Sequence, residues 1–274
     1  MGEPGTVHRV PRRPHAWLAL FLPSQALVAL AWWALGWRIG LPLLLLSHLP
    51  FVAATLLPRA RLYAPVLARL PAAGNAVWLT IDDGPSDDTL PVLDLLDAHG
   101  ARATFFLVGE RAAARPGLVA EIVRRGHDVG NHSHTHPQAW FWALGPRRMA
   151  REVGEAQRTL AELAGAPPRW FRSVVGMTNP FVAAPLKRHG LARVAWSARG
   201  FDAVRDDPAR VAADIERDLA PGAIILMHEG APHGRSVEML AAVLQRLHAS
   251  GYRTTLPGGA GTPPATAKAH GAPG

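Results

Sequence analysis

Two carboxylates and two imidazoles in this chain could together hold a metal ion. Asp82 and Asp83 are adjacent, and His132 and His136 lie four residues apart. That spacing lets two imidazoles face one point across a helical turn or a compact loop. Two His and one Asp leave a fourth position on zinc open for water. Consecutive residues point in different directions, so one aspartate could bind metal while its neighbour faces that water.

Each half of this pattern also has a plainer explanation. A His pair in a His-rich loop is often a solvated surface feature. An Asp pair before Gly84 and Pro85 is often only a turn signal. The metal interpretation therefore depends on whether the fold brings the two halves together.

The elements that must position these residues alternate between short β-rich runs and amphipathic stretches. Helical patterns precede Gly100 and cover residues 149–164 and 237–250. Seven strands alternating with helices predict an α/β parallel sheet, closed or nearly closed into a barrel. The predicted strands are residues 77–82, 103–108, 127–131, 169–173, 192–197, 223–228 and 252–256.

Ionisable residues follow the carboxyl ends of these strands, where barrel enzymes place their chemistry. Burying such groups without partners would be costly, so a shared site is the economical explanation. The first strand ends at the Asp pair and the third runs into the His pair. The other strand ends carry Arg172, Asp202 and His228.

The segment before the α/β pattern is apolar. Residues 16–36 and 39–57 carry no charge, and Arg38 lies between them. At about 1.5 Å per residue, each run reaches roughly the 30 Å of a bilayer core. We expect a helical hairpin that turns at Trp37 and Arg38. Arginines before, within and after it favour both ends in the cytoplasm of a bacterial-type inner membrane. Three prolines leave open a single span with a periplasmic catalytic domain, and a cleaved signal peptide is less favoured.

Composition limits the remaining classes. The 274 residues include no cysteine, so a zinc site must use His, Asp or Glu. The formal charge is +8, but the arginines are scattered and no nucleic-acid partner is expected. A basic protein also suits membrane lipids. The expected domains are a disordered basic leader (1–15), a membrane anchor (16–58), a linker (59–75), an α/β domain (76–256) and a disordered tail (257–274).

Five segments together resemble the NodB-type polysaccharide deacetylases of carbohydrate esterase family 4. Residues 80–85 (Thr-Ile-Asp-Asp-Gly-Pro) resemble the first family motif, and residues 132–136 (His-Ser-His-Thr-His) resemble the second. The third, fourth and fifth motifs correspond to 172–176, 196–202 and 226–228, in the family's order. The resemblance covers about 76–256 and implies a distorted (β/α)7-type barrel, the NodB homology domain, behind the anchor.

The resemblance also implies roles for the polar residues. Asp83, His132 and His136 would be ligands of zinc or a similar divalent ion. Asp82 would be the general base, and Arg172 would keep it ionised and oriented.

The remaining roles concern the leaving group and the acyl pocket. His228 would protonate the departing sugar nitrogen, and Asp202 would favour its imidazolium form. The backbone N–H of Val175 would stabilise the oxyanion, although the third motif lacks the usual prolines and aromatic residue. Trp196 and Leu226 would line a pocket for the acetyl methyl group.

The expected activity is metal-dependent removal of an N-acetyl or other N-acyl group from a sugar in a polysaccharide or lipid-linked glycan. Two alternatives stay open: an esterase for O-acetyl glycans, and a non-catalytic, membrane-tethered glycan-binding protein on the same fold. The sequence gives no indication of the oligomeric state.

Overall fold

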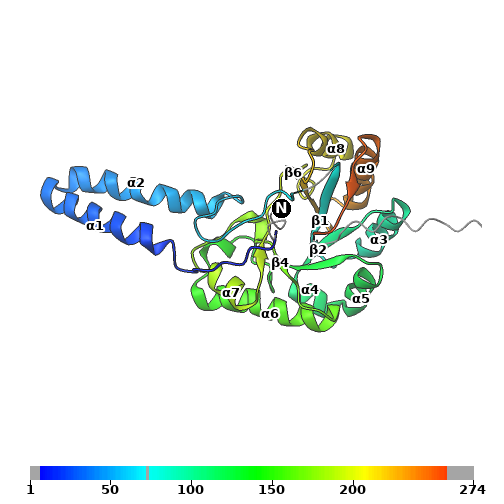
Figure 1. Ribbon diagram of the computed structural model, residues 1–274, viewed down its shortest axis with the longest axis horizontal. Helices are drawn as coiled ribbons and strands as arrows, with labels where there is room; N and C mark the ends of the chain where they lie inside the picture. Colours follow the sequence, from blue (N-terminus) through cyan, green and yellow to red (C-terminus); the bar gives the residue numbers. More distant parts are fainter. Residues whose placement is uncertain (1–6, 72–73, 258–274) are drawn as a thin grey trace, which may run out of the picture.

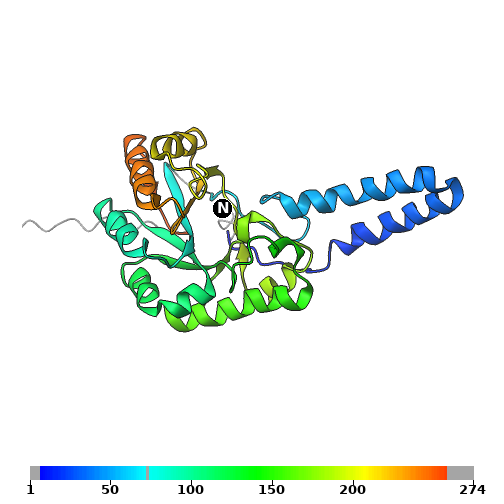
Figure 2. The same ribbon diagram turned by 180° about the vertical axis from the view of Figure 1, so that it is seen from behind.

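The chain forms a helical hairpin and an α/β domain (Figure 1). The computed structural model describes residues 7–71 and 74–257, so the predicted tail lies almost entirely outside the described residues. Helices α1 (Leu18–Leu35) and α2 (Trp37–Leu56) make the hairpin. Figure 2 shows it from behind, clear of the domain except at its base.

The predicted α/β parallel sheet is confirmed. The main sheet has the order β5-β4-β3-β2-β1-β7-β6, with β8 beside the start of β1, and every pairing is parallel. All seven predicted strand segments contain a strand, and only β6 was not expected. The strands are β1 (Ala76–Gly84), β2 (Ala103–Leu107), β3 (Asp128–Asn131), β4 (Trp170–Phe171), β5 (Ala192–Arg193), β6 (Ala198–Arg199), β7 (Ile224–His228) and β8 (Arg253–Thr254).

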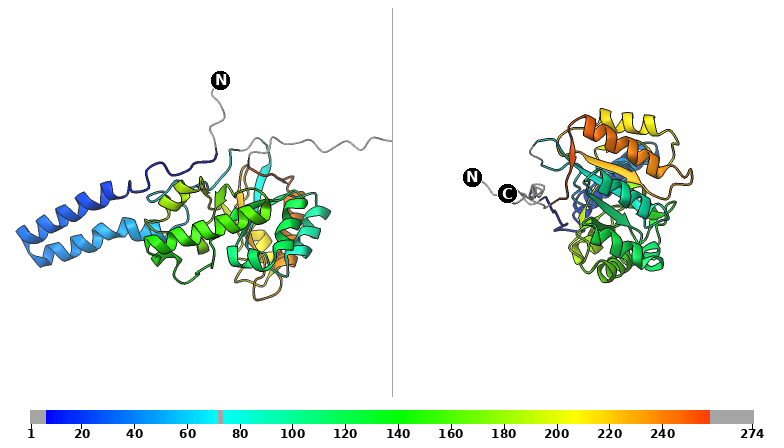
Figure 3. Two further views of the ribbon diagram at one scale, coloured as in Figure 1. Left: turned by 90° about the horizontal axis from the view of Figure 1, so that it is seen from below. Right: turned by 90° about the vertical axis from the view of Figure 1, so that its right-hand side faces the viewer.

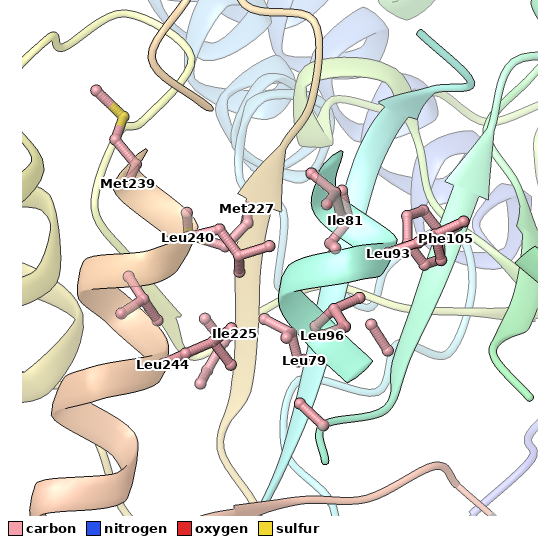
Figure 4. Packing of buried hydrophobic residues seen from close by; sticks show 14 of the residues in the cluster. Leu79, Ile81, Leu93, Leu96, Phe105, Ile225, Met227, Met239, Leu240 and Leu244 are labelled. Atoms are coloured by element: carbon pink, nitrogen blue, oxygen red, sulfur yellow. The ribbon is translucent and has the colours of Figure 1, made fainter. Parts of the chain in front are cut away.

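Side chains of β1 alternate between the two faces of the curled sheet, as the strand period requires. Leu79 and Ile81 face outward and pack against α3 (Thr89–Ala98) and α9 (Ser236–Ala249) (Figure 4). Trp78, Thr80 and Asp82 alternate with them and face the concave interior, where Trp78 joins a second buried cluster. The outer helices complete the alternation: α4 (Gly109–Ala114), α5 (Pro116–Arg124), α6 (Pro146–Ala164), α7 (Ala183–Arg188) and α8 (Pro208–Arg217).

The barrel is open between its edge strands, and part of the predicted linker fills the gap. Leu67 pairs with Val194 beside β5, and Arg69 pairs with Ala223 at the start of β7. The Leu67 N–H donates to the Arg193 carbonyl at 2.9 Å. This segment forms hydrogen bonds with backbone groups on both sides of the gap. The strands therefore need not close fully to satisfy those groups. The predicted distorted (β/α)7-type barrel is therefore confirmed as a curled, open sheet, and full closure of the strands is not found in the described part of the chain.

The hairpin turns one residue earlier than expected. Gly36 has a φ of 77°, which favours glycine, and α2 already begins at Trp37, so Arg38 lies inside its first turn. Gly40 allows close helix packing, since a Cβ there would lie 2.6 Å from the Trp32 ring. Both helices are long and apolar enough to span a membrane, and most of their large hydrophobic side chains are exposed.

The base of the hairpin is part of a buried core. Phe51 and Ala54 of α2 pack in one cluster with Tyr63 of the segment after α2 and with Phe171 of β4, and Trp17 lies against it. The hairpin is therefore fixed to the domain by side-chain packing as well as by the chain itself.

The leader differs from the expectation of disorder over the residues that can be described. Val7 packs against the cluster that contains Trp170, and the His8 ring meets the Trp170 ring edge-on at 5.1 Å. The His8 Nε2 also lies 2.9 Å from the Arg169 carbonyl oxygen. Figure 3 (left) shows this segment running from α1 back along the domain. Residues 1–6 lie outside the described part.

Candidate functional site

Asp83, His132 and His136 converge at the carboxyl edge of the sheet. Their potential ligand atoms all lie within 4.8 Å of one another. The Asp83 Oδ1 is 3.3 Å from the His132 Nε2 and 2.9 Å from the His136 Nε2. Asp83 is the last-but-one residue of β1, and both histidines lie in the loop that follows β3. Two distant segments therefore meet because β1 and β3 both flank β2.

The three side chains fit a divalent cation. The Asp83 Oδ1 is buried and has no hydrogen bond of normal geometry among the described residues. Burial alone would raise the pKa of Asp83, but the two imidazoles outweigh it and hold the pKa below its ordinary value. The His132 Nδ1 lies 2.9 Å from the Arg172 carbonyl. Donation there leaves the lone pair on Nε2, which faces Asp83.

Asp82 forms a buried ion pair with Arg172. The Arg172 Nη1 donates to the Asp82 Oδ1 at 2.7 Å and to the Thr80 hydroxyl at 2.7 Å, and the guanidinium lies 4.3 Å from the Phe106 ring centroid. Arg172 is fully buried, which lowers its pKa, while Asp82 opposes that shift. The second Asp82 oxygen, Oδ2, is directed to the other side and lies 3.8 Å from the His132 Nε2.

His228 lies opposite Asp82. The two Cα atoms are partners in the pairing of β1 with β7. The Asp202 Oδ1 lies 3.1 Å from the His228 Nδ1, and its Oδ2 accepts the His228 backbone N–H at 2.6 Å. Burial would lower the pKa of His228, but Asp202 and the nearby carboxylates outweigh it and raise the pKa to about 9. The His233 Nε2 lies 2.6 Å from the Asp202 backbone carbonyl oxygen and helps to hold Asp202 in place.

A small pocket of about 150 Å³ opens onto these groups. Val175, Trp196 and Leu226 line it together with the acidic and His side chains. Val175 has a φ of 47°, a strained value for a β-branched residue, and is 41% exposed. Eight of the ten residues singled out from the sequence line this pocket, and Arg172 and Asp202 are buried directly behind it.

Several residues at the site were missed by the sequence analysis. Arg199 and Phe201 line the pocket, with the guanidinium carbon 3.9 Å from the Phe201 ring centroid. Glu152 of α6 is 4% exposed and holds the loop after β3: its carboxylate accepts the backbone N–H groups of His134 and Thr135 at 3.0 and 2.8 Å. A glutamate on the apolar face of a helix was the available signal, because such a group needs buried partners.

Comparison with known proteins finds similarity to polysaccharide and chitooligosaccharide deacetylases. Residues 70–194 match the family model described as polysaccharide deacetylase. A chitooligosaccharide deacetylase from Bradyrhizobium sp. (strain ANU 289) is 37% identical over 162 residues, which cover 58% of this chain and 73% of the relative. A second one, from Sinorhizobium fredii, is 33% identical over 203 residues, covering 69% and 94% of the two chains.

Solved structures with a similar fold are also described as members of carbohydrate esterase family 4. A family 4 carbohydrate esterase from Streptomyces lividans, in complex with acetate, is 32% identical with a TM-score of 0.61, covering 68% of this chain and 94% of that one. A family 4 pseudoenzyme from Bacillus anthracis is 26% identical with a TM-score of 0.62, covering 69% and 66%. The fold therefore occurs with and without activity, and the side chains of the site must decide between them.

Glu152 provides a test of how the loop after β3 is held. In Glu152→Ala two backbone N–H groups lose their acceptor, a loss of about 2 kcal/mol. We expect amide hydrogen exchange at His134 and Thr135 to accelerate by about 30-fold, as measured by mass spectrometry. Glu155→Ala is the control, because its half-exposed carboxylate lies 3.8 Å from the His134 Nε2. Equal exchange in the two variants would show that Glu152 does not hold the loop.

Proposed function

The chain belongs to the polysaccharide deacetylase family, and on that basis we propose that it removes an N-acetyl or other N-acyl group from a glycan at a membrane surface. Its enzyme class is that of a carbohydrate N-deacetylase, a hydrolase of carbon-nitrogen bonds other than peptide bonds. The observation that carries the proposal is that Asp82 and His228 line one pocket with the three possible metal ligands. These ligands are Asp83, His132 and His136.

We assign Asp83, His132 and His136 to a divalent ion, zinc or a similar metal. When bound, such an ion would polarise the acyl oxygen and acidify a coordinated water. Asp82 would accept the proton of the attacking water. Its Oδ1 is occupied by Arg172, so the free Oδ2 on the side of His132 is the basic atom.

His228 supplies the proton that the leaving amine needs. Because its pKa is raised to about 9, the imidazole is protonated at neutral pH. Asp202 engages Nδ1, which leaves Nε2 to act on the sugar nitrogen. The pairing of β1 with β7 brings Asp82 and His228 onto neighbouring strands, so the reacting amide would lie between the proposed base and the proposed acid.

The pocket wall offers apolar side chains to an acyl group. Trp196 and Leu226 are buried side chains that line the pocket, and we assign them to the acyl methyl group. The backbone N–H of Val175 is assigned to the developing oxyanion. Its left-handed conformation fits a role in which only the main chain takes part.

Two alternative functions remain as outcomes of experiment. A glycan-binding protein without activity is disfavoured, because base, acid and ligand set are all present in one pocket. An O-acetyl esterase would use the same groups on an easier leaving group, so the choice of substrate distinguishes it from an amidase.

Acetate release tests the proposed chemistry. We expect the full chain in detergent with added zinc to release acetate from N-acetylated chitooligosaccharides, and a chelator to abolish this. Asp82→Asn and His228→Ala should each lower the rate at least about 100-fold, because general base or acid catalysis is lost. Asp94→Asn is the control, a surface carboxylate paired with Arg125. Release that persists in both site variants, or that occurs only from O-acetylated glycans, would contradict the proposal.

The Asp202–His228 pair predicts a shift in pH dependence. The acid form of His228 is active, so activity falls as pH rises through its pKa. Asp202→Asn removes the stabilising negative charge and lowers that pKa from about 9. The alkaline limb of the acetate-release profile should therefore move to lower pH. An unmoved limb, in a variant that still releases acetate, would remove Asp202 from this role.

We further propose that the hairpin anchors the catalytic domain to a bacterial-type inner membrane. Contacts at its base support a lipid-linked or membrane-associated glycan as substrate. The Thr178 N–H donates to the Thr55 carbonyl at 3.0 Å, and the Arg59 Nε donates to the Trp196 carbonyl at 2.9 Å. The end of α2 therefore lies directly behind residues of the pocket wall.

Membrane side is tested by reporters fused after Gly258. The arginines that flank the hairpin favour a cytoplasmic domain. We expect fluorescence from a fused green fluorescent protein and no activity from a fused alkaline phosphatase, with the chain retained in carbonate-washed membranes. The reverse reporter pattern would place the domain in the periplasm, and release by carbonate would contradict anchoring altogether.

A further inference from the structure

Arginine side chains line a second cleft, which is separate from the active-site pocket. It has a volume of about 430 Å³ and shares none of its lining residues with the active-site pocket. Arg9 comes from the leader, Arg61 and Arg69 from the segment after α2, and Arg193 from β5. None of its lining residues is an aspartate or glutamate.

Arg193 is the central group of this cleft. Its side chain is 2% exposed, and its Nη2 donates to the Ala60 carbonyl. Its Nε and Nη1 are buried and have no hydrogen-bond partner among the described residues. Burial alone lowers its pKa to about 10, with no carboxylate to oppose the shift. A buried guanidinium without a counter-ion is costly, and an anion in the cleft would remove that cost.

The positive charge continues toward the hairpin. An adjoining cavity of about 900 Å³ shares Arg9 and adds Arg12 and Lys187, again without an acidic lining residue. Arg12 lies six positions before the start of α1 at Leu18. In the sequence, residues 4–81 contain seven arginines and no aspartate or glutamate. The cleft and cavity therefore form a basic surface beside the base of the proposed anchor.

We propose that this arginine cleft binds the phosphate group of an anionic membrane lipid. Guanidinium groups match phosphate oxygens through parallel N–H donors. Several around one cleft favour a headgroup with net negative charge over phosphocholine, whose phosphate is neutralised by its own ammonium group. The lipid as the source of that phosphate rests on the proposed membrane anchoring. Binding there would fix the orientation of the domain on the bilayer, while the active-site pocket stays free for the glycan.

Titration of the full chain in neutral detergent tests this. The probes are dioctanoyl phosphatidylglycerol, dioctanoyl phosphatidylcholine and inorganic phosphate, measured by calorimetry. We expect phosphatidylglycerol to bind at least ten-fold more tightly than either other probe. The double variant Arg61→Gln/Arg69→Gln should weaken it ten-fold or more. The matched control is Arg158→Gln/Arg210→Gln, which removes two exposed arginines from α6 and α8.

Three binding outcomes would overturn the proposal. Equal binding of inorganic phosphate would make the cleft a site for soluble anions, and equal binding of phosphatidylcholine would remove the role of charge. An equal loss of binding in the control variant would show that binding depends on the overall charge of the protein and not on this cleft. Acetate release from soluble chitooligosaccharides, measured in parallel, should be unchanged in the double variant. A chain that binds phosphatidylglycerol but releases no acetate would sink only the proposed deacetylase function.

Discussion

The buried contact between Arg172 and Asp82 is the constraint on which the site depends. A buried charge pair is costly unless further hydrogen bonds support it. Arg172 also donates to Thr80 and to the Ala195 carbonyl, and only its Nε has no partner among the described residues. Its own carbonyl lies 2.9 Å from the His132 Nδ1. One residue thus orients the proposed base through its side chain and a proposed metal ligand through its backbone. Arg172 follows β4, and Asp82 lies in β1, with β3 and β2 between these two strands. Contact between them across the concave face therefore requires the sheet to curl.

Local backbone strain separates groups that the sequence places side by side. The pairing of β1 with β2 shifts register between Asp82 and Gly84, and Asp83 has a φ of 72°. The shift turns the two aspartates to different tasks, one toward Arg172 and one toward the histidines. Every non-glycine residue with a positive φ in the described chain lies at the site, either at the end of β1 or in one of the segments after the other strands. Such conformations persist where surrounding contacts over-determine them, which is typical of functional sites. These residues are Asp83, Ser133, His136, Val175 and Phe201.

The sequence could predict whatever depends on short-range pattern. Strand ends rich in ionisable groups indicated where the chemistry should lie, and the structure brings those residues together, either lining one pocket or buried directly behind it. Contacts between distant segments could not be predicted in the same way. The pairing of Leu67 with Val194 carries no periodicity, and the turn at Gly36 was misplaced because charge at Arg38 outweighed the glycine signal. Arg193 looked like any scattered arginine until the fold buried it.

Residues 58–70 connect the anchor, the pocket and the sheet. Pro58 lies so close to Gly176 that a Cβ on that glycine would be 2.7 Å from its ring, and Arg59 holds the Trp196 carbonyl. Farther along, Leu67 closes the seam of the barrel, and Arg61 and Arg69 line the arginine cleft. A displacement of the hairpin would therefore be transmitted to the pocket wall through backbone contacts within a few residues. If the hairpin is inserted as proposed, the membrane would do more than retain the domain, because residues 58–70, which support the pocket wall, follow directly after α2.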